Sequence, residues 1–365
     1  MRLAAVAAAV LIAVALARPV RANSVTNEVF VTSAQTSDAN PRALIFTDSL
    51  TSSFDLGEDW SLTGGFSLTL PGRTPAATEA QFDETSQAIT FFTLALDWSA
   101  TDNLTLGVTG DFSPASTQFA GAPISLRQAD GTELVANAEI RSRTSHLAAG
   151  FDAWWDTFGH SDLEWTFTGG LTVSSYDIDQ GITRIRTANG TTLTAQELID
   201  QTNAYCAAHP RRTKCGQNVL NALKATPSTL SFERLSAGAT ARLFQDTDLT
   251  LLGDYYVYNQ DPSQVGYFGL AAVGREAGLP IAPLRYLIRP EVAHRFGDLT
   301  AKVWVQAGEY VTGTAETTAA IGLRMQYKFS KAFRAWLTVS GQRDVDENGN
   351  DSRFGTVSGG LGLRW

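Results

Sequence analysis

The chain has 365 residues and a formal net charge of −9, an acidic balance that argues against nucleic acid as a partner. It is too long for one ordinary soluble domain, yet no linker or shift of composition divides it. The mean hydropathy of −0.07 resembles that of a soluble protein. An average near zero also results from strands with one apolar and one polar face, because the two faces cancel in the mean.

The first 22 residues predict a signal peptide. Met1-Arg2 is a short positive start, and the apolar run Leu3–Leu16 is too short to span a membrane. Cleavage is possible after Ala17 or after Ala22, and we favour Ala22 because it leaves an uncharged start. Residues 23–365 then form one domain.

Paired strands separated by short turns rich in Asp, Gly and Ser fill the rest of the chain, with longer segments between the pairs. Fourteen strands are predicted, of which Ser24–Ser33 has the weakest pattern. If Ser24–Ser33 is a tail and not a strand, the predicted number of strands falls to twelve. The other predicted strands are Ala43–Leu56, Trp60–Leu70, Gln87–Trp98, Leu104–Ser113, Ser142–Trp155, Leu163–Tyr176, Thr229–Phe244, Leu249–Gln260, Leu284–Phe296, Leu299–Val311, Thr317–Phe329, Phe333–Arg343 and Arg353–Trp365.

The last predicted strand alternates as a lipid-facing strand does and ends on an aromatic residue. Its Ser358, Gly360, Leu363 and Trp365 resemble the assembly signal of Gram-negative outer-membrane barrels. The resemblance implies a porin-like protein that is integral to the bacterial outer membrane. It also implies contacts with membrane lipid and lipopolysaccharide, and with the barrel assembly machinery during biogenesis.

The lipid face is clearest in the strand 317–329, where Ile321, Leu323, Met325 and Tyr327 alternate with polar or small residues. Aromatic residues gather beside the short turns, where a girdle at the periplasmic interface belongs. These are Trp60, Trp98, Trp155, Phe158, Phe296, Phe329, Phe333 and Trp365. We therefore expect an all-β membrane protein, an antiparallel transmembrane β-barrel.

The inward face predicts two walls of opposite charge. The later strands carry the basic residues Arg234, Arg242, Arg285, Arg289, Arg295, Lys302, Arg324, Lys328 and Arg334. The earlier strands carry the acidic residues Asp55, Asp97, Asp111, Asp152 and Glu164, and Asp254 and Glu291 are exceptions among the later strands. Such an arrangement resembles the transverse field of general porins, and it orients dipolar solutes while disfavouring large apolar ones. A lumen closed by salt bridges is the alternative.

The segment 177–228 is the one long loop without a β pattern. Thr194 and Glu197 fit a capping box, and two helical faces follow with a break at His209-Pro210. Cys206 and Cys215 predict a disulfide in an exported chain, which would pin a helical hairpin. Its turn carries Arg211, Arg212 and Lys214. The hairpin either enters or covers the lumen, where these cations would favour anions, or stands outside it.

No catalytic, metal or cofactor site is expected. Ser145 and His146 are adjacent, so in a strand they point to opposite faces and cannot act as a nucleophile and base. His160 falls in a short turn and His294 on the lipid face, while His209 is the only ligand near the cysteines.

The sequence therefore predicts an outer-membrane channel for passive diffusion of small hydrophilic solutes, anions among them. A barrel that acts in surface binding, or in export or assembly with a partner protein, is the alternative. Fatty-acid channels have the same strand number, but they carry a longer N-terminal hatch than residues 23–42 supply. The solute and the oligomeric state stay open.

Overall fold

The computed structural model describes residues 24–35, 43–70, 86–157, 163–211, 214–224, 226–244, 246–262, 284–311, 316–345 and 351–365. The expected signal peptide lies outside these residues, as do Phe158, His160 and Arg212. No helix in the described ranges is both long and apolar enough to cross a membrane.

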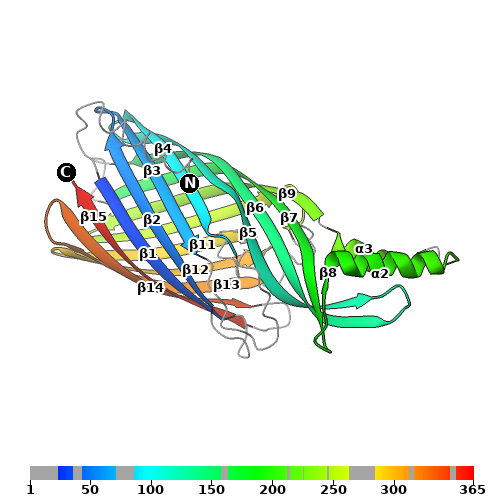
Figure 1. The fold of residues 1–365 in the computed structure, drawn as a ribbon. Helices are drawn as coiled ribbons and strands as arrows, with labels where there is room; N and C mark the ends of the chain where they lie inside the picture. Colours follow the sequence, from blue (N-terminus) through cyan, green and yellow to red (C-terminus); the bar gives the residue numbers. More distant parts are fainter. Residues whose placement is uncertain are drawn as a thin grey trace.

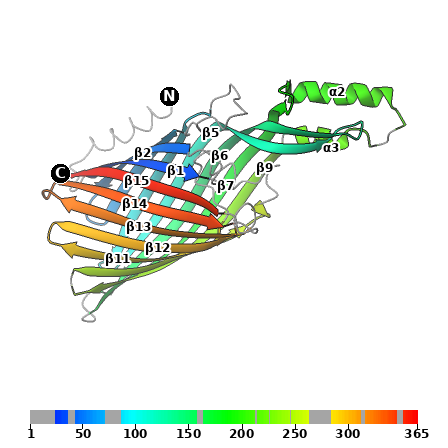
Figure 2. The same ribbon diagram turned by 90° about the horizontal axis from the view of Figure 1, so that it is seen from below.

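Fourteen antiparallel strands of the described chain close into a barrel (Figures 1 and 2). The first strand, β1 (Ser24–Gln35), pairs along its whole length with the last, β15 (Asp351–Arg364), and with β2 (Ala43–Asp55). The prediction of fourteen strands is confirmed, and the alternative of twelve is excluded because Ser24–Ser33 belongs to the wall. The remaining barrel strands are β3 (Trp60–Leu70), β4 (Ile89–Thr101), β5 (Leu104–Arg127), β6 (Glu133–Asp156), β7 (Glu164–Thr187), β9 (Thr226–Leu243), β10 (Thr247–Tyr258), β11 (Leu284–Phe296), β12 (Leu299–Tyr310), β13 (Thr317–Lys328) and β14 (Phe333–Val345).

The outer surface is an apolar band built by strict alternation. In β13 the predicted lipid-facing residues Ile321, Leu323, Met325 and Tyr327 are 41–59% exposed. Each of the other thirteen barrel strands also has at least one large apolar side chain exposed on its outer face. Large apolar side chains at this exposure are costly in water and stable in lipid. Near the short turns, Trp60 stacks on Trp98 with ring centroids 5.8 Å apart, as expected of an interfacial girdle.

Three strands are much longer than predicted. β5, β6 and β7 have 24 residues each, whereas the other barrel strands have 11 to 18. The expected loop 177–228 is wrong at both ends, since Asp177–Thr187 belongs to β7 and 226–228 to β9. The extension is stable because it has a core of its own. That core comprises Ile124, Leu126, Ala136, Ala138, Ile182, Ile185, Leu198, Val219 and Leu223.

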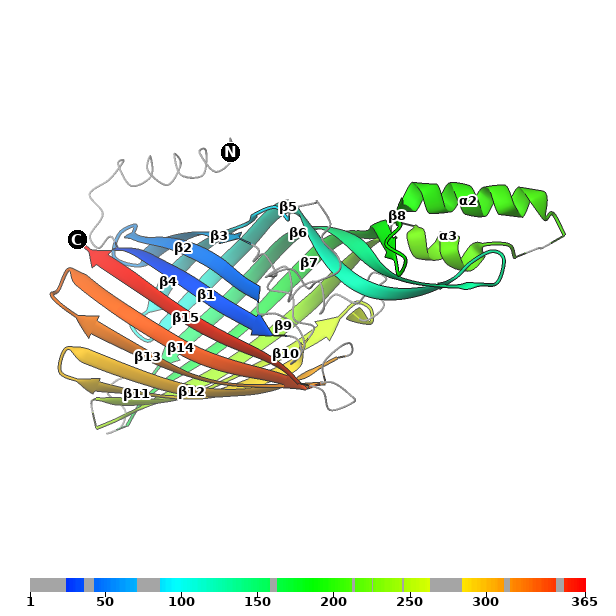
Figure 3. The same cartoon turned by 60° about the horizontal axis from the view of Figure 1, so that its bottom comes forward.

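A small helical unit covers this extension. It consists of β8 (Thr192–Thr194), α2 (Ala195–Ala208) and α3 (Gln217–Leu223). The predicted capping box is present, because the Glu197 amide donates to Thr194 Oγ1 over 3.1 Å and the Thr194 amide donates to Glu197 Oε2 over 2.7 Å. These bonds from Thr194 lower the pKa of Glu197. Figure 3 shows both helices outside the barrel, alongside the extended part of β5 to β7.

The expected disulfide joins Cys206 and Cys215 across the hairpin turn, with Cα atoms 5.6 Å apart. Arg211 and Lys214 lie in this turn, between α2 and α3, and both helices extend away from the barrel (Figure 1). Of the two positions considered for the hairpin, the structure has the outer one. These cations therefore do not lie in the pore, and the reason is that Leu198, Val219 and Leu223 bury their side chains against the long strands.

We predict that replacing both cysteines with serine loosens only the hairpin. The crosslink spans a sequence separation of 9, for which loop entropy gives a local stabilisation of about 2.5 kcal/mol. The expected result is faster proteolysis between α2 and α3, with no change in the unfolding temperature of the barrel. A barrel that unfolds at lower temperature in the double variant would contradict this separation.

Candidate functional site

The candidate site is the inner surface of the barrel. With one exception, the predicted acidic and basic residues lie on the strand face opposite to the exposed apolar side chains, as Arg324 does between Leu323 and Met325. The exception is Arg285. It lies at an irregularity of β11 between Leu284 and Tyr286, and it forms a salt bridge with Glu309, which shares the outward face of β12 with Val303 and Val305. The bulge turns Arg285 away from the lumen side.

The two expected walls are recognisable in the described chain. Most of the acidic residues come from β2 to β7 and β10, and most of the basic ones from β11 to β14. At the short-turn end, Arg242 joins the walls of β7 and β10 by pairing with Glu164 at 3.0 Å and Asp248 at 3.2 Å. Such a pair in water contributes little to stability, so its effect is on the field inside the barrel.

Two carboxylates hold the cations of the basic wall in place. Glu291 is buried between Arg289 and Lys302, at 2.5 and 2.7 Å. Glu28 of β1 accepts a hydrogen bond from Ser358 over 2.7 Å and lies 3.9 Å from Arg324. Glu28 is absent from the predicted lumen residues because the place of β1 in the wall was open. Each carboxylate offsets part of the positive charge and fixes the direction of a long side chain.

Two indole rings lie between the backbone of the sheet and these cations. Trp304 and Trp336 lie flat over glycines of the neighbouring strands, so that a Cβ on Gly322 would be 2.0 Å from Trp304, and one on Gly360 would be 2.2 Å from Trp336. The guanidinium groups stack above them. Arg289 is 5.1 Å from the Trp304 ring centroid, while Arg324 and Arg334 are 4.8 and 5.8 Å from that of Trp336. Sequence reasoning missed this layer, because it depends on which glycine faces each tryptophan across the sheet.

The other wall carries a row of rings toward the long-loop end. We call it the aromatic row, and it consists of Phe91, His146, Tyr176, Phe232, Tyr256 and Tyr258. Successive ring centroids lie 4.2 to 6.0 Å apart. Each member falls on the inward face, and in sequence they are scattered over five strands. These residues become neighbours only through the pairing register of the strands, and the alternation in the sequence does not give that register.

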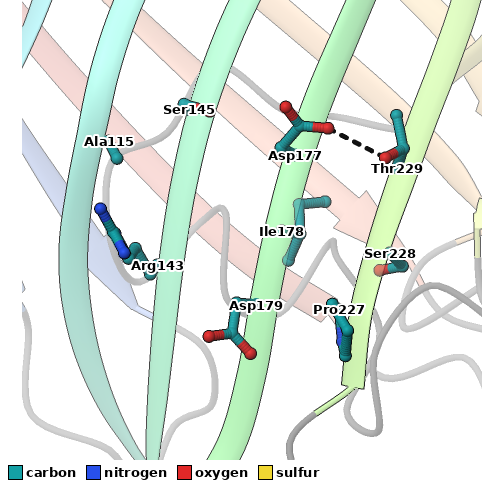
Figure 4. Close-up of a pocket in the computed structure, with 9 residues that line it drawn as sticks. All are labelled: Ala115, Arg143, Ser145, Asp177, Ile178, Asp179, Pro227, Ser228 and Thr229. Atoms are coloured by element: carbon teal, nitrogen blue, oxygen red, sulfur yellow. Dashed lines mark hydrogen bonds between the residues drawn. The ribbon is translucent and has the colours of Figure 1, made fainter.

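A groove of about 490 Å³ lies on the outer wall and not in the lumen (Figure 4). Ser145, Asp177 and Asp179 line it, and Thr229 donates to Asp177 over 2.9 Å. Ser145 thus points outward while the neighbouring His146 packs between Phe91 and Tyr176 on the inside. The separation agrees with the expectation that these two residues do not form a nucleophile and base.

No protein-family model and no curated protein matches the sequence. Solved structures match across nearly the whole chain. The toluene transporter TbuX of Ralstonia pickettii is 8% identical, with 96% of this chain and 90% of that chain covered and a TM-score of 0.57. A FadL homologue of Pseudomonas aeruginosa is 9% identical, with 94% and 89% covered and a TM-score of 0.56. The CymD monoaromatic hydrocarbon channel is 8% identical, with 94% and 88% covered and a TM-score of 0.52.

The fold is that of an outer-membrane β-barrel. The prediction of this class is confirmed, and the matched structures are transporters and channels. At 8–9% identity the likeness concerns the fold alone. It shows, however, that fatty-acid-channel-type barrels are structural neighbours of this chain, although sequence reasoning set them apart by the length of their N-terminal hatch.

Proposed function

We propose that the protein is an outer-membrane channel through which small hydrophilic solutes, anions among them, diffuse passively. The observation that carries the proposal is the pair of luminal walls with opposite charge. The stacked Arg289, Arg324 and Arg334 stand against acidic residues of the other wall, including Asp97 and Asp152. A transverse field of this kind lowers the cost of entry for charged and dipolar solutes.

The channel should conduct without its helical hairpin. We predict stepwise conductance of the reconstituted protein in planar bilayers, and an equal step size when residues 191–224 are replaced by a short Gly-Ser linker. The reason is that α2 and α3 pack on the extension of β5 to β7, beyond the wall. A matched preparation of heat-unfolded protein is the control. Folded protein that gives no steps, with or without the hairpin, would mean that the channel proposal is wrong.

A second candidate solute class is hydrophobic, because two of the matched structures are a toluene transporter and a monoaromatic hydrocarbon channel. The aromatic row favours it, since rings bind apolar solutes. Liposome uptake separates the two. Hydrophilic transport predicts swelling in small neutral sugars and organic anions, whereas a hydrocarbon channel predicts uptake of a monoaromatic hydrocarbon without swelling. A barrel that shows neither activity supports the remaining alternative, a role in surface binding or assembly with a partner.

A further inference from the structure

The aromatic row is a continuous surface on the inside of the barrel. His146 links Phe91 and Tyr176 at centroid distances of 5.5 and 4.2 Å, and Phe232 links Tyr176 to Tyr258 at 6.0 and 5.3 Å. The Tyr258 hydroxyl donates to the Leu284 carbonyl over 2.8 Å, which fixes this end of the row. Offset and tilted ring contacts of this kind are favourable by about 1 kcal/mol each.

A cation lies directly beside the row. Arg234 is one inward position from Phe232 along β9, and it pairs with Tyr256 across β10 and with Thr172 across β7. Its Nη2 donates to Thr172 Oγ1 over 3.2 Å, and its Nε is buried without a partner. Within the described chain Arg234 forms no salt bridge, unlike Arg242, Arg289 and Arg324. Its hydrogen-bond partner Thr172 is neutral, and Asp152 of β6 acts on Arg234 electrostatically without forming a salt bridge with it. The guanidinium therefore keeps hydrogen-bond donors available to an anion.

On the β7 side of Arg234, opposite to Tyr256, the inward positions are small. Thr172 pairs with Gly150, and Ser174, beside Phe232, pairs with Ala148. The acidic residues around this surface are Asp254 and Asp152, one step toward the short turns, and Asp111, which acts electrostatically on His146 and Tyr176. Asp254 already accepts a hydrogen bond from Ser236 over 2.7 Å. The wall is therefore shallow beside the cation and ringed on one side by aromatic faces.

We propose that the aromatic row and Arg234 form a luminal site for aromatic carboxylates. The ring of the solute stacks on the row, and its carboxylate binds the Arg234 guanidinium. This inference rests on the proposed channel function and names its solute class. It differs from a site for hydrocarbons, because these have no acceptor that pairs with the Arg234 guanidinium. It also differs from a site for small anions, because these have no ring that stacks on the aromatic row.

The test is block of single-channel current by three probes of similar size. Benzoate has both the ring and the charge, cyclohexanecarboxylate has only the charge, and benzyl alcohol has only the ring. Benzoate should block at concentrations about tenfold or more below the other two, because a charged hydrogen bond and a stacked ring are each worth about 1.5 kcal/mol. Calorimetric titration of the detergent-solubilised protein with benzoate gives the affinity without reference to conductance.

Two variants locate the site, and one is the matched control. Phe232→Leu and Arg234→Gln should each weaken benzoate binding about tenfold, while Tyr255→Leu should leave it unchanged. Tyr255 is adjacent to Tyr256 in sequence, but it lies on the outer face and is 51% exposed. The unfolding temperature of each variant is measured first. If Arg234→Gln does not fold, Arg234→Lys takes its place, with a smaller expected loss because it keeps the charge and loses only the planar fork that binds a carboxylate.

The outcomes separate the two proposals. Steps of conductance with equal block by all three probes, or with no block, would overturn the aromatic carboxylate site and leave the channel intact. The same holds if Tyr255→Leu weakens binding as much as Phe232→Leu does, because the row would then act only through the packing of the sheet. Folded protein without conductance but with benzoate binding lost in Arg234→Gln would overturn the channel and keep the site.

Discussion

Replacing Gly360 with leucine should destabilise the barrel by about 3 kcal/mol or prevent its assembly. The Cβ of any larger residue would be 2.2 Å from Cζ2 of Trp336, which is 7% exposed and lies flat over the glycine. The indole has to leave this place, and with it the cation–π contacts to Arg324 and Arg334. Overpacking of a rigid site costs about 1–3 kcal/mol, and the lost stacking adds to that figure. Urea unfolding in lipid vesicles measures the loss.

The neighbouring glycine supplies the control. Gly359 faces outward, and a Cβ there has its nearest contact at 3.9 Å, so Gly359→Leu should be neutral or stabilising in lipid. Combining Gly360→Leu with Trp336→Ala should restore part of the lost stability, since the leucine then occupies the space of the indole. Equal losses for Gly359→Leu and Gly360→Leu would contradict the prediction, because the contact with Trp336 would then not set the cost at Gly360.

Alternation was sufficient to predict most of the fold. In a membrane barrel the apolar face of each strand has to lie against lipid. The alternation of apolar residues in Thr317–Phe329 therefore predicts that Ile321, Leu323 and Met325 of β13 are exposed on the outer surface, as they are. The same rule placed the luminal charges, except at Arg285, where a bulge breaks the period. The weak pattern of β1 did not reveal its partner, which depends on register: Glu28 faces Gly360 and Val29 faces Gly359 of β15.

The extension of β5 to β7 was beyond a sequence reading. Its residues alternate less clearly, since both faces of the sheet meet protein or water there and no lipid imposes a pattern. Ile182 and Ile185 lie on the same face because the β6–β7 register shifts between them, where β7 has Thr183 as an extra residue opposite Glu139 and Ile140. The helices are predictable from their capping box, but their position depends on that local core.

The charged residues of the candidate site were predictable from the sequence, whereas their contacts with aromatic rings were not. Arg289, Arg324 and Arg334 appear in the inward pattern, whereas their contacts with indole rings depend on the strand register, as in Trp336↔Gly360 and Trp304↔Gly322. The aromatic row has the same origin. Phe91 and His146 are not on adjacent strands, and they meet because the intervening position on β5 is the small Ser113.

Neutralising the basic wall should move the ion selectivity of the channel toward cations about tenfold. The change is the triple variant Arg289→Gln, Arg324→Gln and Arg334→Gln. A charge about 10 Å from a permeating ion contributes about 0.4 kcal/mol in water, so three together amount to about 1.2 kcal/mol, close to one factor of ten. The reversal potential in a salt gradient measures the ratio, at low ionic strength because the screening length is about 10 Å at 0.1 M.

The opposite wall gives the mirror experiment. Asp97→Asn, Asp111→Asn and Asp152→Asn together should move the selectivity toward anions by a similar factor, and Lys331→Gln in the turn between β13 and β14 should leave it unchanged. Opposite shifts from the two triple variants are the signature of a transverse field, in which each wall attracts its own counter-ion. If both variants shift the reversal potential in one direction, or if neither does, ions do not pass between these walls.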